Sequence, residues 1–117
     1  MKYDYSYLLK NTEELRKLIL ENPELPLVVF AGQDANIGDY SMVACSRISA
    51  YIGEVLDCET EYSDEVHTDR EYFAEVVSDY YYSSFDGTES EFDEYIDAKV
   101  AEYDQYWKKC IILEVDN

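Results

Sequence analysis

Apolar residues recur at helical spacing near the start of the chain. A stripe of such side chains is formed by Leu15, Leu18 and Ile19. Asn11 precedes this stripe and Glu14 stands three residues further on, which is the spacing of an N-terminal capping box. Pro23 follows the stripe, and the residue before a proline is disfavoured in a helix. The pattern predicts a first helix over residues 11–22.

The second half of the chain repeats the helical pattern twice. A capping box begins at Thr68 and another at Thr88, because each threonine has a glutamate three residues on. Apolar side chains then follow at spacings of three and four residues: Phe73, Val76, Val77 and Tyr80, and later Phe92, Tyr95, Ile96, Val100, Tyr103 and Trp107. We therefore expect helices over 69–82 and 89–106, joined by a turn at 83–87.

Continuous or alternating apolar runs predict the strands. Residues 27–31 and 110–115 are short apolar runs rich in β-branched side chains. Since they are the most apolar runs, we expect both in the centre of the sheet. Between them, alternation of apolar and polar residues favours two strands near 41–47 and 50–58. A helix over 44–52 is the main alternative for that part.

In chain order these elements are helix, strand, strand, strand, helix, helix, strand. This order predicts an α+β fold in which a small mixed or antiparallel sheet of about four strands packs against about three helices. A length of 117 residues is typical of one domain, so we expect a single domain over residues 1–117.

The acidic residues are concentrated in one part of the chain. Of 27 acidic residues, seventeen fall between positions 57 and 104, where the basic residues are Arg70 and Lys99. The same stretch holds seven tyrosines, whereas disordered acidic segments are poor in aromatic residues. We therefore expect it to be folded, with the carboxylates outside. Because such a surface repels phosphate groups, direct binding to nucleic acid or to a membrane is disfavoured, and a basic partner is expected.

The first residues do not resemble a signal peptide, because no charged segment is followed by a long apolar one. The three cysteines, Cys45, Cys58 and Cys110, form no close pair in the sequence. An odd number of unpaired cysteines indicates reduced thiols. These features predict a cytoplasmic location.

Candidate catalytic and metal-binding residues are few. The sequence has no glycine-rich phosphate loop and no paired-cysteine metal pattern. Asp34, Asn36 and Asp39 do not fit a calcium-binding loop, which requires Gly at its sixth position and Glu at its twelfth. Cys58 with His67 is a candidate nucleophile pair, but a single histidine among carboxylates is typical of a surface residue. The sequence therefore predicts no catalytic residue, no metal and no cofactor, and the chain is not expected to be an enzyme.

The predicted helix over 89–106 carries acidic residues at helical spacing. Asp93, Asp97 and Asp104 follow one another at four and seven residues. Carboxylates one turn apart lie ~5.4 Å apart along a helix, which is of the same order as the ~3.4 Å rise between nucleotides of a strand. Tyrosines between the acids add rings on which guanidinium groups stack. The alternative interpretation, an ordinary solvated face of an acidic protein, fits the residue pattern equally well.

We expect the partner-binding surface to consist of eleven residues: Glu71, Glu75, Asp79, Asp86, Glu89, Asp93, Glu94, Asp97, Asp104, Tyr81 and Tyr82.

Three segments of the chain resemble small acidic accessory proteins that bacteriophages and plasmids of low-GC Gram-positive bacteria encode. They are Asn22 to Ala31, Ile52 to Cys58 and Tyr106 to Leu113. Proteins of this kind include anti-CRISPR and anti-restriction inhibitors, some of which resemble nucleic acid in the layout of their charges. The resemblance covers less than half of the chain and includes no catalytic motif, so no site residue is transferred.

Together, charge and resemblance predict an inhibitor of a bacterial defence nuclease, acting in the cytoplasm of the host cell. Its partner would be a basic nucleic-acid-binding protein, with a Cas nuclease as the favoured class. Two alternatives remain open at this point. One is a metal-dependent enzyme that acts on nucleic acid or on a nucleotide signal, and the other is an acidic phage adaptor protein.

Overall fold

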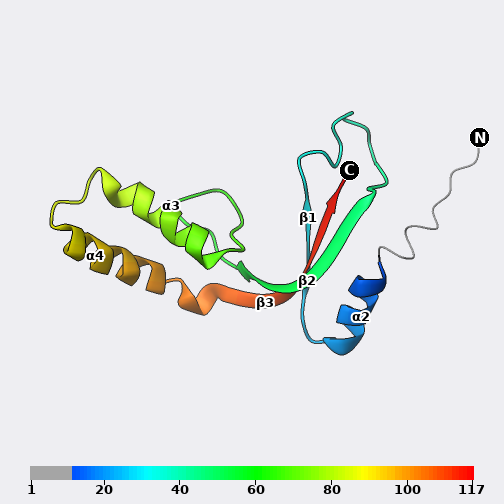
Figure 1. The fold of residues 1–117 in the computed structure, drawn as a ribbon, viewed down its shortest axis with the longest axis horizontal. Coiled ribbons are helices and arrows are strands. Elements are labelled where there is room, and N and C mark those ends of the chain that lie inside the picture. The colour runs from blue at the N-terminus through cyan, green and yellow to red at the C-terminus, as the bar shows by residue number, and fades with distance from the viewer. Residues whose placement is uncertain (1–11) are drawn as a thin grey trace, which may run out of the picture. The chain divides into compact units, whose positions relative to one another are not determined.

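The computed structural model describes residues 12–117, which form an α+β fold (Figure 1). The described elements are α2 (Glu13–Glu21), β1 (Leu27–Ala31), β2 (Arg47–Leu56), α3 (Arg70–Tyr82), α4 (Glu89–Ala101), the 3-10 helix η1 (Asp104–Tyr106) and β3 (Trp107–Asp116). Residues 12–117 thus contain three α-helices and a three-stranded mixed sheet, which confirms the predicted α+β class but has three strands where about four were expected.

The chain packs as two compact units. Unit 1 comprises Met1–Gly53 and Lys109–Asn117, and unit 2 comprises Glu54–Lys108. Each unit has buried apolar residues of its own: Cys110, Ile111 and Ile112 in unit 1, and Val55, Leu56, Phe73, Val77, Ile96 and Trp107 in unit 2. The expectation of a single domain over 1–117 stays a prediction.

The sheet has the strand order β1-β3-β2, with β3 in the middle. β1 and β3 run parallel, in a register that pairs Leu27 with Ile111 and Val29 with Leu113. β2 runs antiparallel to β3, since the Tyr51 hydroxyl donates to Glu114, late in β3, at 3.2 Å, whereas Asp57, just after β2, donates its N–H to Tyr106, just before β3, at 2.9 Å. The prediction that residues 110–115 form a central strand is therefore confirmed.

The prediction that residues 27–31 form a central strand is wrong. Within the described residues β1 pairs with β3 alone, which makes it an edge strand. Leu27 and Val29 keep 45% and 55% of their surface exposed, while Val28 and Phe30 are half-buried. An apolar run therefore did not identify the centre of this sheet, because only alternate side chains of β1 are covered.

A separate strand near 41–47 was predicted, but residues 41–46 lie in a loop and residue 47 already begins β2. The Asn36 side chain accepts from the backbone N–H of Tyr40 at 2.9 Å and donates to its carbonyl, and Asp39 adopts φ 56°. Both features hold the chain in a turn. Met42 is 88% exposed, so the apolar alternation there faces no core. The alternative helix over 44–52 is also wrong, because β2 occupies 47–56.

The first predicted helix is present as α2 over Glu13–Glu21, within the expected range of 11–22. Its N-cap residue is Thr12, and Asn11, the predicted cap, lies outside the described residues. The helix ends at Asn22, whose side chain donates to the Leu18 carbonyl oxygen at 3.1 Å.

α3 and α4 form a helical hairpin in unit 2, where they lie side by side (Figure 1). At the start of α4 the Thr88 hydroxyl accepts from the Glu91 N–H at 3.2 Å, as the capping box requires. α4 ends at Ala101, earlier than the predicted 106, because η1 follows and Trp107 already begins β3.

The cap of α3 lies one residue later than predicted. Asp69, not Thr68, is the N-cap residue, and its carboxylate accepts from the backbone N–H groups of Glu71 and Tyr72 at 2.9 and 3.3 Å. Aspartate is the better acceptor here because its negative charge also interacts favourably with the positive end of the helix dipole.

Replacing Asp69 with alanine is expected to lower the free energy of unfolding by about 1 kcal/mol, because two N–H groups lose their acceptor. Thr68→Ala is the matched control and should change it by less than about 0.5 kcal/mol. Asp69→Asn keeps a capping oxygen while removing the charge, so it should retain most of the stability. Urea denaturation followed by circular dichroism measures all three variants. A larger loss in Thr68→Ala than in Asp69→Ala would contradict this assignment of the cap.

Candidate protein-binding surface

Which acidic residues of α3 and α4 are exposed depends on which side chains these helices bury. One core cluster is formed by Leu56, Phe73, Val77, Ile96 and Trp107. Phe73 and Val77 come from α3 and Ile96 from α4, so both helices turn these residues toward a shared interior. Side chains on the other face of each helix are consequently left outside, and several of the candidate residues lie there.

On α3, three candidate carboxylates form one row. Glu71, Glu75 and Asp79 are all exposed and follow at intervals of four residues. A helix turns 3.6 residues per turn, so this spacing places them one above the other on the face opposite Phe73 and Val77. The structure therefore brings these three candidates together.

On α4, Asp93 and Asp97 form a second row, with Glu94 beside them. All three are exposed; Glu94 lies on the side of the helix opposite buried Ile96, while Asp93 and Asp97 flank the buried side. Glu89 is in the first turn of the same helix and is also exposed. These four candidates share one helix, as predicted.

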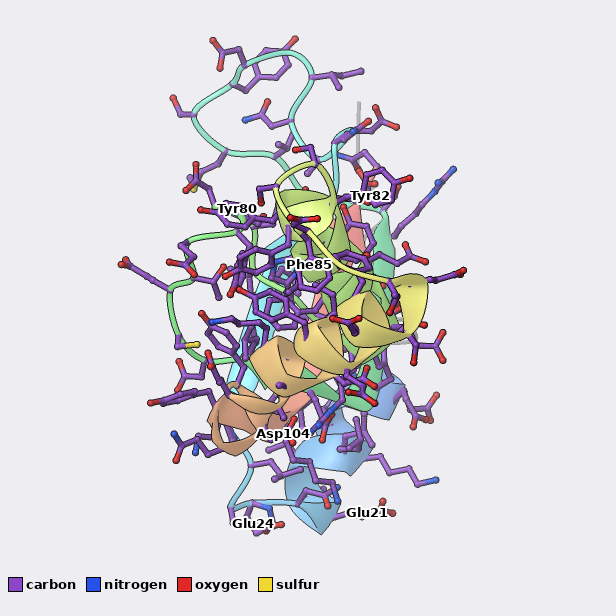
Figure 2. The ribbon with its side chains drawn as sticks, turned by 90° about the vertical axis from the view of Figure 1, so that its left-hand side faces the viewer. Glu21, Glu24, Tyr80, Tyr82, Phe85 and Asp104 are labelled. Atoms are coloured by element: carbon purple, nitrogen blue, oxygen red, sulfur yellow. The ribbon has the colours of Figure 1, made fainter. Side chains whose placement is uncertain are left out.

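Asp104 does not belong to the α4 row. The sequence pattern assigned it to the same helix as Asp97, but α4 ends at Ala101 and Asp104 lies in η1. Figure 2 shows Asp104 well away from Tyr82 and Phe85. Its carboxylate pairs with Arg70 at 3.9 Å. The local change from α-helix to 3-10 helix explains why helical spacing failed here.

The remaining candidates lie at the C-terminal end of α3 and in the turn that follows it. Tyr82 is 76% exposed and Asp86 is exposed, whereas Tyr81 is half-buried. Figure 2 shows Tyr80, Tyr82 and Phe85 near this end of the hairpin. Tyr81 points inward, since it packs against the core cluster and its hydroxyl is 3.1 Å from that of Tyr62. Tyr81 thus supports the surface from beneath, while Tyr82 is available to a partner.

Few of the carboxylates in unit 2 are neutralised by basic side chains. Unit 2 holds eighteen acidic residues and three basic ones, Arg70, Lys99 and Lys108. Arg70 makes a bidentate contact with Glu54, at 2.8 and 3.2 Å, and Lys99 lies 3.9 Å from Glu102. The hydrogen bond from Arg70 lowers the pKa of the Glu54 carboxyl. None of these ion pairs involves a carboxylate of the rows on α3 and α4.

A cluster of tyrosine rings packs against the core of the hairpin. Tyr62 contacts the rings of Phe73, Tyr80, Tyr81 and Tyr103, with ring centroids 4.9 to 6.3 Å apart. Burial first, and then the hydrogen bond with Tyr81, raises the pKa of the Tyr62 phenol. Sequence reasoning did not single out Tyr62, because it lies in a loop without periodic spacing.

The structure does not support a nucleophile pair formed by Cys58 and His67. Burial, followed by the nearby charge of Asp57, raises the pKa of the Cys58 thiol, which disfavours the reactive thiolate. His67 is 3% exposed, so the expectation of a surface histidine is wrong. Its ring packs 5.0 Å from that of Phe73, a packing position inside unit 2.

Among residues 12–117, no three His, Cys, Asp or Glu side chains are grouped so that they could hold a metal ion. Within the same residues no helix is long and apolar enough to cross a membrane. Comparisons of the chain with protein-family models, with curated proteins and with solved structures gave no match.

Proposed function

We propose that this chain inhibits a basic nucleic-acid-binding protein by occupying its nucleic-acid groove with the outward faces of α3 and α4. The observation that carries the proposal is the pair of carboxylate rows. They lie on a folded hairpin, and among residues 12–117 no basic side chain forms an ion pair with them. An acidic protein that only needed solubility would gain the same benefit from carboxylates scattered over its surface.

The rigidity of the hairpin favours binding over simple solvation. Tyr62, Phe73 and Trp107 pack with neighbouring rings in one aromatic core, which fixes the two helices that carry the rows. Because the carboxylates are already placed, a basic partner orders few additional side chains when it binds, and less conformational entropy is lost. The arginine and lysine residues of the partner, which normally contact the phosphates of nucleic acid, would contact these carboxylates instead.

The target we propose is a bacterial defence nuclease, with a Cas nuclease as the favoured class. The resemblance to acidic phage and plasmid proteins supports this choice, and the charge of unit 2 supports a basic groove as the docking place. In this proposal the chain acts as a stoichiometric inhibitor and not as an enzyme.

The experiment is a nuclease protection assay with the purified protein against a panel of Cas and restriction nucleases. Inhibition should be complete at about one inhibitor per nuclease, and guide RNA or DNA bound beforehand should prevent it. Raising the salt from ~0.1 to ~0.5 M should weaken binding, because screening shortens the range of charge interactions below ~10 Å. Inhibition at far less than one inhibitor per nuclease, or inhibition that bound nucleic acid does not affect, would overturn the proposal.

A further inference from the structure

The end of the α3–α4 hairpin contains a hollow of about 440 Å³. It is lined by Tyr82, Phe85, Gly87, Thr88, Glu89 and Phe92. Three of these residues are aromatic and one is a carboxylate, and all of them belong to unit 2. The hollow thus combines ring surfaces with a negative charge in one place.

Contacts between the rings form the wall of the hollow. The Phe92 ring lies 6.2 Å from that of Tyr82 and 5.2 Å from that of Phe85. Phe85 also contacts Tyr95 at 5.1 Å, which ties it to the side of the core cluster. Gly87 allows the close approach, because a Cβ at this position would lie 2.9 Å from Phe85 Cε1. The wall is therefore set by packing within the hairpin.

The charge around the hollow is negative throughout. No lysine or arginine occurs between Arg70 and Lys99, and Asp86 and Glu89 flank Gly87 and Thr88. The positive end of the α4 dipole is opposed by two first-turn carboxylates, those of Glu89 and Glu91. A cationic group therefore fits these negatively charged surroundings better than an anionic or neutral group does.

The basic residues of unit 2 already show how its rings bind cations. The Arg70 guanidinium lies 5.0 Å over the Trp107 ring. The Lys99 ammonium lies 5.9 Å from the Tyr81 ring and 5.4 Å from the Tyr95 ring. Two of the three basic residues in this unit are thus held over aromatic faces, whereas the rings of the hollow have no basic side chain of the unit over them.

We propose that the hollow receives an arginine side chain of the basic partner. The planar guanidinium stacks on the exposed Tyr82 ring, and its N–H groups donate to the Glu89 carboxylate. Arginine suits this combination better than lysine, because its flat, weakly hydrated cation stacks on rings and donates two parallel hydrogen bonds. The identity of the partner rests on the proposed function, but the preference for guanidinium belongs to the hollow itself.

The test uses hexa-arginine and hexa-lysine peptides, which carry equal charge, and the isotope-labelled full chain. The arginine peptide should bind roughly threefold to fivefold more tightly than the lysine peptide at the same ionic strength, as stacking at an exposed ring allows. The ring signals of Tyr82, Phe85 and Phe92 should shift in the nuclear magnetic resonance spectrum with the arginine peptide.

Tyr82→Ala should abolish the preference for arginine, with the loss of affinity falling mainly on hexa-arginine, while Tyr82→Phe should keep the preference. Tyr72→Ala is the matched control, because Tyr72 is 47% exposed on the same helix and lies roughly 15 Å from Tyr82 along its axis. It should keep the preference as well.

Equal binding of the two peptides, or a preference that survives Tyr82→Ala, would overturn the assignment of the hollow. Either result would leave the proposed function intact if the nuclease assay succeeds. Conversely, a Tyr82-dependent preference for arginine without inhibition of any nuclease would support the hollow and count against the proposed target.

Discussion

Changing Glu75 to Gln and Asp79, Asp93 and Asp97 to Asn should weaken binding to the inhibited nuclease by at least ~100-fold. Truncating one partner of a charge pair in a desolvated groove costs about 2–5 kcal/mol, and a pair at the rim costs far less. The expected loss therefore requires only one or two of the four carboxylates to be enclosed by the partner. Affinity is measured by titrating each variant into the nuclease identified by the panel, at constant salt.

The matched control removes the same charge from unit 1. Four glutamates of unit 1 are all exposed: Glu13, Glu14, Glu21 and Glu24. Changing them to Gln also reduces the net negative charge of the chain, from −18 to about −14. This control should reduce affinity by less than about fivefold, because long-range attraction is largely screened beyond ~10 Å. If both variants lose affinity equally, net charge and not the hairpin surface determines binding. A folded hairpin variant that binds as tightly as the parent chain would refute the proposed surface.

The fold was predictable where the residue pattern determines local structure. Thr88 with Glu91 specified the start of α4, and Phe73 with Val77 specified the buried face of α3. Asp69 shows the limit of such patterns, since two adjacent polar residues can both cap a helix and only the geometry decides between them. The sheet was harder to predict, because exposure of Val29 depends on which strands lie beside β1, and that information is not local.

The candidate surface was predictable to a similar extent. Helical periodicity placed Asp93 and Asp97 on one helix, and both are exposed on α4. It failed at Asp104, because α4 ends at Ala101 and Asp104 belongs to the 3-10 helix that leads into β3. The hollow beside Tyr82 gave no signal in the sequence, since Phe85 and Phe92 come from a turn and a helix and meet only after folding.

Replacing Ile112 with Asp should unfold unit 1. Ile112 is 1% exposed in the central strand β3, and β2 packs against it so closely that a Cβ at Gly53 would lie 2.7 Å from Ile112 Cδ1. A carboxylate there would lose its water and find no partner, at a cost of several kcal/mol, which is comparable to the whole stability of a small domain, about 5–15 kcal/mol. Loss of dispersed amide signals from β1 and β3 in the nuclear magnetic resonance spectrum is the measurement.

Val29→Asp is the matched control, because it adds the same charge to the neighbouring strand at a side chain that is 55% exposed. It should change the free energy of unfolding by no more than about 1 kcal/mol. Native-like spectra and melting for Ile112→Asp would mean that β3 is not the buried centre of the sheet.

The fluorescence of Trp107, which is buried in unit 2, adds a second test in the same variant. If the chain folds as the single domain expected from its length, Trp107 becomes exposed when unit 1 unfolds. If Trp107 stays buried, unit 2 folds on its own and the acidic hairpin does not depend on the sheet.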